Sequence, residues 1–239
     1  MSIQGNGYVL AFNSSPRKDE GFTDIVLRRF MAGAEAESVE VETVYLAEKK
    51  IADCLGCTYC WFKTPGVCRH KDDVPELHEK MQRADVLVYA TPLYISSMSG
   101  IMKSFLDRIM PMAEPYQEYE DGVCRHPHGG NKDQRTVLLS TCGFPGLRNF
   151  DPLVLTFQRI VEIGGSALHA AVLFPSSVLL VGDPCPAEEQ LDYVYKAGRE
   201  VMGEGIRAET VEGYSKPYVD PEVYVEDLNT LFRNLRENI

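Results

Sequence analysis

The feature that most constrains the fold is a series of short, almost continuous apolar runs. They have strand length and read "YVLAFN" (8–13), "DVLVYA" (85–90), "TVLLST" (136–141) and "ALHAAVLF" (167–174). A strand with one face in water would alternate apolar and polar residues, so these runs indicate strands that are buried on both faces. A parallel sheet covered by helices on both sides provides such burial.

Helical patterns lie between these runs, with apolar residues at helical spacing in segments 26–34, 74–81 and 101–109. The segment "VEVETVYL" (39–46) differs, because its first valines alternate with acids. This alternation predicts a less buried edge strand. Alternating strands and helices predict an open, doubly wound α/β domain, whose ligand binds beyond the carboxyl ends of the strands.

Composition narrows the function classes. The chain has 239 residues, 44% of them hydrophobic, which is enough for one sizeable core with appended elements. Its formal charge is −11 and its basic residues are scattered, which argues against nucleic acid as a partner. We find no leader pattern and no apolar run of membrane-span length, so we expect a cytoplasmic protein that does not bind membranes.

Two segments fall outside the α/β plan. The polar stretch 111–135 is too long for an ordinary connection and predicts a lid, an interface arm or a disordered loop. Residues 204–239 form a tail, and we therefore divide the chain into a domain at 1–203 and an extension at 204–239. We expect the apolar stripe of the tail to dock on the chain's own core, with packing on another subunit as the alternative. The stripe consists of Leu228, Leu231, Phe232 and Leu235.

The loop after the first apolar run has the residues of an anion site. It reads "NSSPRKDEGFTDIV", with small hydroxylated residues, one arginine, and Thr23 at the start of an amphipathic helix. Free backbone N–H groups, hydroxyl donors and the helix dipole would face one point there. The alternative is that Thr23 is only a helix N-cap. Neither the Rossmann glycine pattern nor a P-loop is present.

Two further loops would lie at the same edge of the sheet. "TPLYISSMSG" follows the third predicted strand (85–90), and "STCGFPG" (140–146) follows the fourth (136–141). A flat ligand could lie against the backbone there, with Leu93, Tyr94 and Ile95 around its rings. The three loops would then surround one pocket.

Four of the seven cysteines lie in the segment "CLGCTYCWFKTPGVC". Cytosolic thiols stay reduced, so such a dense group indicates metal binding or catalysis before it indicates disulfides. The spacing of Cys54, Cys57 and Cys60, with Cys68 after seven residues, is that of bacterial [4Fe–4S] sites. Zinc is the nearest competitor, although its four-cysteine sites usually draw on two separate segments. The third possibility is that the thiols hold no metal.

These stretches carry a resemblance to a known family. "SSPR…GFT", the cysteine segment followed by "CRHKDDVPELHEKMQRADVLVYATPLY", and "SGIMKSFLDR" resemble the flavodoxin-like NAD(P)H-dependent FMN reductase family, in particular its iron–sulfur flavoprotein branch. The resemblance covers about residues 8 to 175. It implies a five-stranded parallel sheet of order 2-1-3-4-5 with non-covalently bound FMN. Two positions depart from the usual pattern, Ser14 where relatives have glycine and Phe22 where they have asparagine.

The resemblance also implies the cofactor residues. The FMN phosphate would be held by Ser15, Arg17 and Thr23, with Phe22 beside them, and the isoalloxazine by the backbone around Pro92, Leu93, Tyr94, Ile95, Thr141, Cys142 and Gly143. The [4Fe–4S] cluster would be held by Cys54, Cys57, Cys60 and Cys68. A homodimer or homotetramer would bring the cluster of one subunit towards the flavin of another.

Our leading hypothesis is an oxidoreductase that passes electrons between a reduced donor, NAD(P)H or ferredoxin, and an acceptor. FMN and the cluster carry the chemistry, so no side chain is assigned as a catalytic residue. One alternative is an NAD(P)H-dependent FMN or quinone reductase without a cluster. The other is a non-catalytic redox carrier or sensor.

Overall fold

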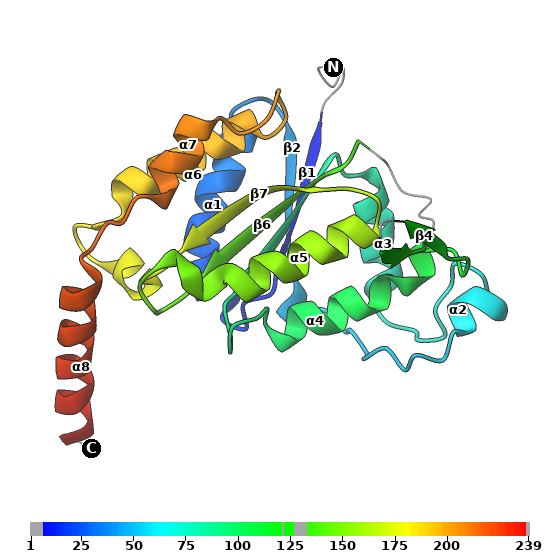
Figure 1. Ribbon diagram of the computed structural model, residues 1–239, viewed down its shortest axis with the longest axis horizontal. Helices are drawn as coiled ribbons and strands as arrows, with labels where there is room; N and C mark the ends of the chain where they lie inside the picture. The colour runs from blue at the N-terminus through cyan, green and yellow to red at the C-terminus, as the bar shows by residue number, and fades with distance from the viewer. Residues whose placement is uncertain (1–6, 121, 127–132, 238–239) are drawn as a thin grey trace.

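The structure is a computed structural model that describes residues 7–120, 122–126 and 133–237. Its centre is a five-stranded sheet in which every pair of neighbouring strands is parallel (Figure 1). The strand order is β2-β1-β3-β6-β7, which confirms the predicted order 2-1-3-4-5. The strands are β1 (Tyr8–Asn13), β2 (Glu40–Tyr45), β3 (Val86–Pro92), β6 (Arg135–Thr141) and β7 (Leu168–Phe174).

Burial follows the apolar runs. All residues of β1 and β3 are buried, because helices cover both of their faces. In β2 only Val44 is buried, as expected for an edge strand whose residues alternate with acids. The alternating run marks an edge of the sheet correctly, and the continuous runs of β1, β3 and β6 mark its centre. The prediction fails for the run 167–174, because it forms β7 at the other edge, where only Val172 and Phe174 are buried.

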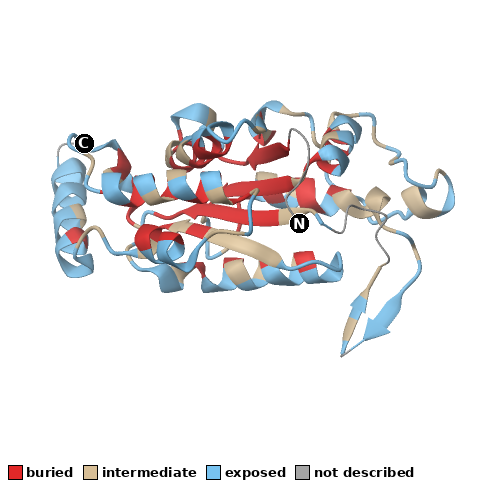
Figure 2. Cartoon of the chain, turned by 90° about the horizontal axis from the view of Figure 1, so that it is seen from above, coloured by how far each residue is buried: buried red, intermediate tan, exposed pale blue. Residues whose placement is uncertain are grey.

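Helices form a layer on each face of the sheet (Figures 1 and 2). One core cluster joins the sheet to α1 (Phe22–Glu35) and α6 (Glu188–Glu200). The other joins it to α3 (Val74–Arg83), α4 (Gly100–Leu106) and α5 (Asp151–Ile163). The short helical segments are η1 (Lys18–Glu20), η2 (Leu46–Glu48), α2 (Tyr59–Phe62), η3 (Asp107–Met112), η4 (Leu147–Phe150) and η5 (Ser177–Val181).

Two glycines let α1 and α6 approach closely. A Cβ on Gly33 would lie 2.0 Å from the Tyr195 carbonyl oxygen, and one on Gly198 would lie 1.9 Å from the Phe30 carbonyl oxygen. No side chain fits at either distance, so the backbones of the two helices are in direct contact. This contact fixes α1, whose first turn forms part of the candidate site.

The insertion forms a small arm. Strands β4 (Glu118–Glu120) and β5 (Val123–Arg125) pair as an antiparallel hairpin that projects from the body (Figure 2). Tyr116 and Tyr119 are exposed on it. The described part of the segment is thus a projecting arm, and its role as an interface stays a prediction; residues 127–132 lie outside the described residues.

The tail divides into a docked part and a projecting part. Helix α7 (Ala208–Ser215) packs on α6, and the Tyr214 hydroxyl donates a hydrogen bond to the Ala171 carbonyl oxygen at 3.2 Å. Helix α8 (Pro221–Glu237) projects from the body (Figure 1), and Tyr224 is its one buried residue. The prediction that its apolar stripe docks on the chain's own core is wrong, because the helix leaves the body after its first turn. Its large apolar side chains are about half exposed: Leu231 48%, Phe232 53% and Leu235 52%.

Within the described ranges, no helix combines the length and apolar character that a bilayer span needs.

Candidate functional site

Three loops meet at the carboxyl end of the sheet, and we call residues 14–21, 92–99 and 141–146 the three-loop edge. The first loop is held by a buried serine pair. The Ser14 hydroxyl donates to the Ala90 carbonyl oxygen at 3.2 Å, and the Ser99 hydroxyl donates to the Ser14 hydroxyl at 2.9 Å. Ser99 is also the N-cap of α4. The departure from glycine at Ser14 is therefore accommodated, because its side chain joins two of the loops.

The start of α1 is open to an anion. Its N-cap residue is Gly21, and no side chain caps the first turn, so the first backbone N–H groups lack a side-chain acceptor. A Cβ on Gly21 would lie 2.5 Å from the Ser15 hydroxyl oxygen, so glycine leaves room for that hydroxyl beside the helix end. Uncapped N–H groups and the helix dipole favour a negative ligand.

The candidate phosphate residues surround this helix end. Ser15 and Thr23 are buried, whereas Arg17 is exposed. The Arg17 guanidinium lies over the Phe22 ring, 5.2 Å from its centroid. Phe22 therefore replaces the hydrogen bond of an asparagine with a cation–π contact that orients the arginine.

Two hydrogen bonds tie the loops together. The hydroxyl oxygens of Thr23 and Thr141 are 2.8 Å apart, so the first turn of α1, which directly follows the first loop, touches the third loop. The Leu93 N–H donates to the Thr141 carbonyl oxygen at 2.8 Å, which joins the second loop to the third. The residues predicted from three distant segments thus come together at one edge of the sheet.

The second loop carries backbone strain. Residues Tyr94 to Ser97 form a tight turn in which Ile95 and Ser96 have positive φ values, 47° and 60°. A β-branched residue rarely adopts this conformation, and the Ile95 side chain is 97% exposed. Phe144 in the third loop is also 70% exposed. Strain and exposed apolar side chains at one edge are typical of a surface that receives a flat ligand.

The C-terminal tail contacts the third loop through a hydrogen bond. The buried Tyr224 of α8 donates its hydroxyl hydrogen to the Gly143 carbonyl oxygen at 2.5 Å. Cys142 is buried, and burial raises the pKa of its thiol, which keeps it neutral. We did not predict Tyr224 as a site residue, because nothing in its local sequence indicates a contact with a loop 81 residues away.

The four cysteines lie on an exposed segment after η2. Cys54 and Cys57 are exposed, and Cys60 and Cys68 are partly buried. Burial raises the pKa of Cys60, with further contributions from Cys68, Cys54 and Cys57, so the four sulfurs lie within electrostatic range of one another. Among the described residues, no three ligand side chains are grouped closely enough to hold a metal ion.

A buried arginine anchors the end of this segment. The Arg108 guanidinium donates to both carboxylate oxygens of Asp72, at 2.6 and 3.1 Å, and to the Ala52 carbonyl oxygen at 2.6 Å. The Arg108 side chain is 1% exposed and that of Asp72 is 7% exposed. Burial opposes the charge of Arg108, but Asp72 and Cys68 raise its pKa. The stretch "SFLDR" did not indicate this role of Arg108, because the sequence alone does not show which distant segment the side chain contacts.

Both implied cofactors fit the residues present. The uncapped helix end, the room beside Gly21 and the buried hydroxyls suit a phosphate, and the exposed apolar loops suit a ring system. Four thiols from one segment suit an iron–sulfur cluster. In addition, the buried Arg108 Nε has no hydrogen-bond partner, and Arg108 interacts with the Cys68 thiol. A thiolate or cluster sulfur at Cys68 could accept the hydrogen of that Nε.

Comparisons with known proteins place the chain in a family. Residues 8–123 match the family model described as NADPH-dependent FMN reductase. An iron–sulfur flavoprotein of Methanocaldococcus jannaschii is 34% identical over 109 residues, which are 46% of this chain and 55% of that protein. An iron–sulfur flavoprotein of Archaeoglobus fulgidus is 36% identical over 160 residues, which are 67% of this chain and 70% of that protein. The chain thus spans about half of the first relative and over two thirds of the second.

Solved structures agree on the fold. An NAD(P)H:quinone oxidoreductase from Methanothermobacter marburgensis has a TM-score of 0.59 at 20% identity, over 84% of this chain and 99% of that chain. At this identity the similarity concerns the fold alone. The residues matched by the family model, 8–123, include the first loop, the cysteine segment and the loop after β3. The chain belongs to the flavodoxin-like NADPH-dependent FMN reductase family, in its iron–sulfur flavoprotein branch.

Proposed function

We propose that the chain is an FMN-dependent oxidoreductase that passes electrons between a reduced donor, NAD(P)H or ferredoxin, and an acceptor. The observation that carries the proposal is the contact of the three loops, in which the Thr23 and Thr141 hydroxyl oxygens are 2.8 Å apart. This contact brings an anion site and a flat apolar surface to the same edge. FMN has both a phosphate and a planar ring system.

The phosphate half of the site would be Ser15, Arg17 and Thr23. Backbone N–H groups at the uncapped start of α1 supply donors, and the dipole of this 14-residue helix supplies positive potential. Arg17 adds a full charge from the solvent side, and its contact with the Phe22 ring restricts its position. Each of these groups binds and orients the ligand without a proton transfer.

The ring half would be the backbone of residues 92–95 and 141–143. The strained turn presents Ile95 and the third loop presents Phe144, so a bound ring would be shielded from water. Tyr224 keeps the Gly143 carbonyl oxygen occupied, which sets the orientation of that peptide. When bound, FMN supplies hydride and single-electron chemistry, and the protein supplies position and potential.

The cluster site would be Cys54, Cys57, Cys60 and Cys68, which fits a [4Fe–4S] cubane. Arg108 supports this assignment, because its buried charge lies beside Cys68 and would stabilise a ligating thiolate. Thiolate ligation usually completes the geometry of such a loop, so the open arrangement of the thiols does not count against it.

The domain and partner assignments follow from these sites. We propose residues 1–203 as the FMN-binding domain and 204–239 as an extension that supports it through Tyr224. Exchange with a redox partner or a small acceptor, and assembly as a homodimer or homotetramer, complete the proposal. These assignments are supported by the family alone.

The test is a spectrum with iron and sulfide analysis of protein purified without oxygen. We expect flavin bands with about four irons and four sulfides per chain. Cys57→Ser should lose most of the iron and keep the flavin, whereas Cys124→Ser, an exposed thiol on the hairpin, should keep both. Flavin without iron would leave an FMN reductase that lacks a cluster, and absence of both would refute the proposal.

The phosphate site has its own test. Arg17→Ala should weaken FMN binding about 10-fold or more, because it removes a charge-assisted hydrogen bond. Arg148→Ala is the matched control, since this arginine is 99% exposed beside the same edge. Equal FMN dissociation constants for the two variants would place the phosphate elsewhere.

A further inference from the structure

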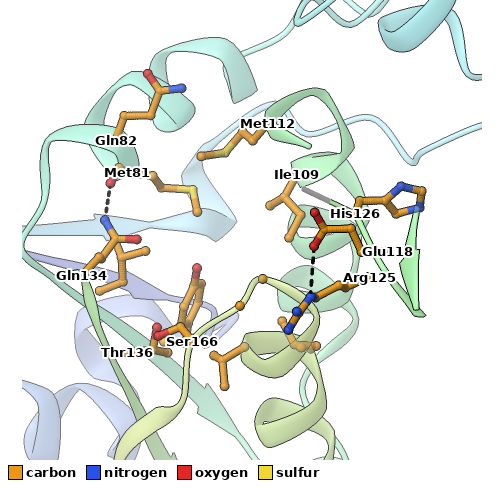
Figure 3. A pocket seen from close by; sticks show the side chains of 16 residues that line it. Met81, Gln82, Ile109, Met112, Glu118, Arg125, His126, Gln134, Thr136 and Ser166 are labelled. Atoms are coloured by element: carbon orange, nitrogen blue, oxygen red, sulfur yellow. Dashed lines mark hydrogen bonds and ion pairs between the residues drawn. The ribbon is translucent and has the colours of Figure 1, made fainter. Parts of the chain in front are cut away.

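A cavity of about 410 Å³ lies at the other end of the sheet from the three-loop edge. It is enclosed by the end of α3, by η3, by the β4–β5 hairpin and by the end of α5 (Figure 3). Leu87 and Thr136 line it near the amino ends of β3 and β6. Small-molecule pockets usually measure about 300 to 1,000 Å³, so this cavity is large enough for a compact ligand.

The cavity wall combines apolar and polar side chains, with slightly more apolar than polar surface. Side chains from the two strands, three helical segments and the loop before β7 contribute to it. The apolar lining residues are Met81, Leu87, Ile109, Met112, Ile160 and Val161. Contact with the apolar part of this wall favours a ligand with little charge, because an ion would lose hydration there.

Tyr89 supplies an unpartnered polar group in this wall. Its side chain is 6% exposed and packs against Phe12 and Phe157, with ring centroids 6.0 and 5.6 Å apart. Its hydroxyl has no hydrogen bond to any residue that the structure describes, yet the residue lines the cavity. Burial raises its pKa, so the hydroxyl stays protonated and can donate. The hydroxyl therefore lies at the cavity surface, where it can donate a hydrogen bond to an acceptor of a bound ligand.

The charges around the mouth are already paired. Arg125 donates to Glu118 at 3.3 Å and also pairs with Glu120 (Figure 3). His126 uses its Nδ1 with the Tyr116 carbonyl oxygen at 2.7 Å. The Gln134 side-chain amide donates to two backbone carbonyl oxygens at the end of α3. Among the lining residues that the structure describes, no unpaired cation is left for an anionic ligand, which favours a neutral one.

We propose that this cavity binds a small, uncharged and largely apolar molecule with a carbonyl oxygen, which accepts a hydrogen bond from the Tyr89 hydroxyl. The site is separate from the three-loop edge, so this molecule does not compete with FMN. The proposal does not depend on the proposed function. The hairpin contributes one wall, which gives the inserted segment a role in binding.

Ligand binding should also change the surroundings of Trp61, which lies in the cysteine segment. The ring of Trp61 lies 4.9 Å from that of His126, centroid to centroid, and its indole N–H donates to the Met110 and Ala113 carbonyl oxygens. These residues flank the η3 wall of the cavity. Trp61 is the single tryptophan of the chain, so its fluorescence reports from this rim.

The experiment titrates the full, FMN-loaded chain with 4-fluoroacetophenone, an uncharged aryl ketone, and follows the ¹⁹F linewidth and Trp61 emission. We expect saturable binding that excess FMN does not displace, and no binding of 4-fluorobenzoate, its charged analogue. Tyr89→Phe should weaken binding about 5-fold or more by removing the donor. Tyr119→Phe, an exposed hairpin residue, should leave it unchanged.

A second variant keeps the test decisive if Tyr89→Phe unfolds. Ser166 is exposed at the mouth, so Ser166→Phe should narrow the entrance and abolish binding without disturbing the core. The proposal is overturned if the ketone shows no saturable binding, if FMN displaces it, or if neither variant weakens it.

Discussion

The three-loop edge and the cysteine segment are the two candidate cofactor sites, and they differ in how far the fold alone completes them. At the three-loop edge, buried hydroxyls and backbone bonds already join the loops, with Thr23 against Thr141 and Ser14 against Ser99. In the cysteine segment, Cys54 and Cys57 are exposed, and the segment is anchored through Ala52 and Asp72 at its two ends and through the Trp61 indole between them. The first site is preorganised, whereas we expect the second to take its final geometry from the metal.

The difference follows from where each site is attached. Parallel strands end at one edge of a sheet, so the register of β1, β3 and β6 sets the spacing of the three loops. The cysteine segment follows the edge strand β2 and is held by side chains of η3, of α4 and of the turn before α3. It therefore depends on a few buried polar contacts, which mutation can remove one at a time.

The largest expected effect comes from removing the anchor of the cysteine segment. Arg108→Met should lower the free energy of unfolding by about 4 kcal/mol, because Asp72 would remain as a buried, unpaired carboxylate. Lys103→Met breaks the exposed pair with Asp107 nearby and should cost less than about 1 kcal/mol. Denaturant unfolding measures both, and similar losses would mean that Arg108 is no special anchor.

The same anchor should make stability depend on pH through His78. Burial, and then repulsion by Arg108, lower the pKa of His78 to about 4, against the attraction of Asp72. The unfolded chain, with a pKa of about 6.5, binds a proton first as the pH falls, so stability is full above about pH 6.5 and decreases towards pH 4. The shift corresponds to about 3 kcal/mol.

His78→Gln should remove this decrease, since glutamine does not titrate. The measurement is the free energy of unfolding of both proteins at intervals between pH 7 and pH 4. Parallel curves for the two proteins would show that His78 does not carry the dependence.

A smaller effect should appear at the three-loop edge. Tyr224→Phe removes the hydrogen bond to the Gly143 carbonyl oxygen and should raise the FMN dissociation constant about 5-fold, which is about 1 kcal/mol. Tyr214→Phe removes a similar bond to Ala171 within β7 and should leave FMN binding unchanged. Fluorescence titration with FMN compares the two. If both variants bind FMN like the unmodified chain, the tail does not support this loop.

The smallest effect concerns the strained turn. Ile95→Gly should raise the stability of the FMN-free protein by about 0.5 kcal/mol, because glycine adopts a positive φ without strain. The same change should weaken FMN binding, since it removes an exposed apolar side chain at the ring surface. Ser96→Gly, in the same turn, should change FMN binding less. A variant that gains stability and keeps its affinity would show that the strain serves no ligand.

Parts of the site could be predicted from sequence because they are local. The small residues before Thr23, the turn after Pro92 and the cysteine spacing all carry their signal within about ten residues. The contacts that complete the sites could not be predicted in this way. Arg108 reaches Asp72 across 36 residues, and Tyr224 reaches Gly143 across 81. Such pairs depend on the packing of whole elements, which no local pattern encodes.

The amino-acid sequence by itself determined the alternation of strands and helices, the buried centre and exposed edge of the sheet, and the position of the three loops. The spacing and the continuity of apolar residues indicate these features, because the faces that a strand or helix buries determine where its own apolar residues lie. Only the tertiary structure decided that α8 projects, that Ser14 and Ser99 pair, and that a cavity opens between α5 and the hairpin. These features arise where elements from distant parts of the chain meet, and their geometry depends on how all of them pack together.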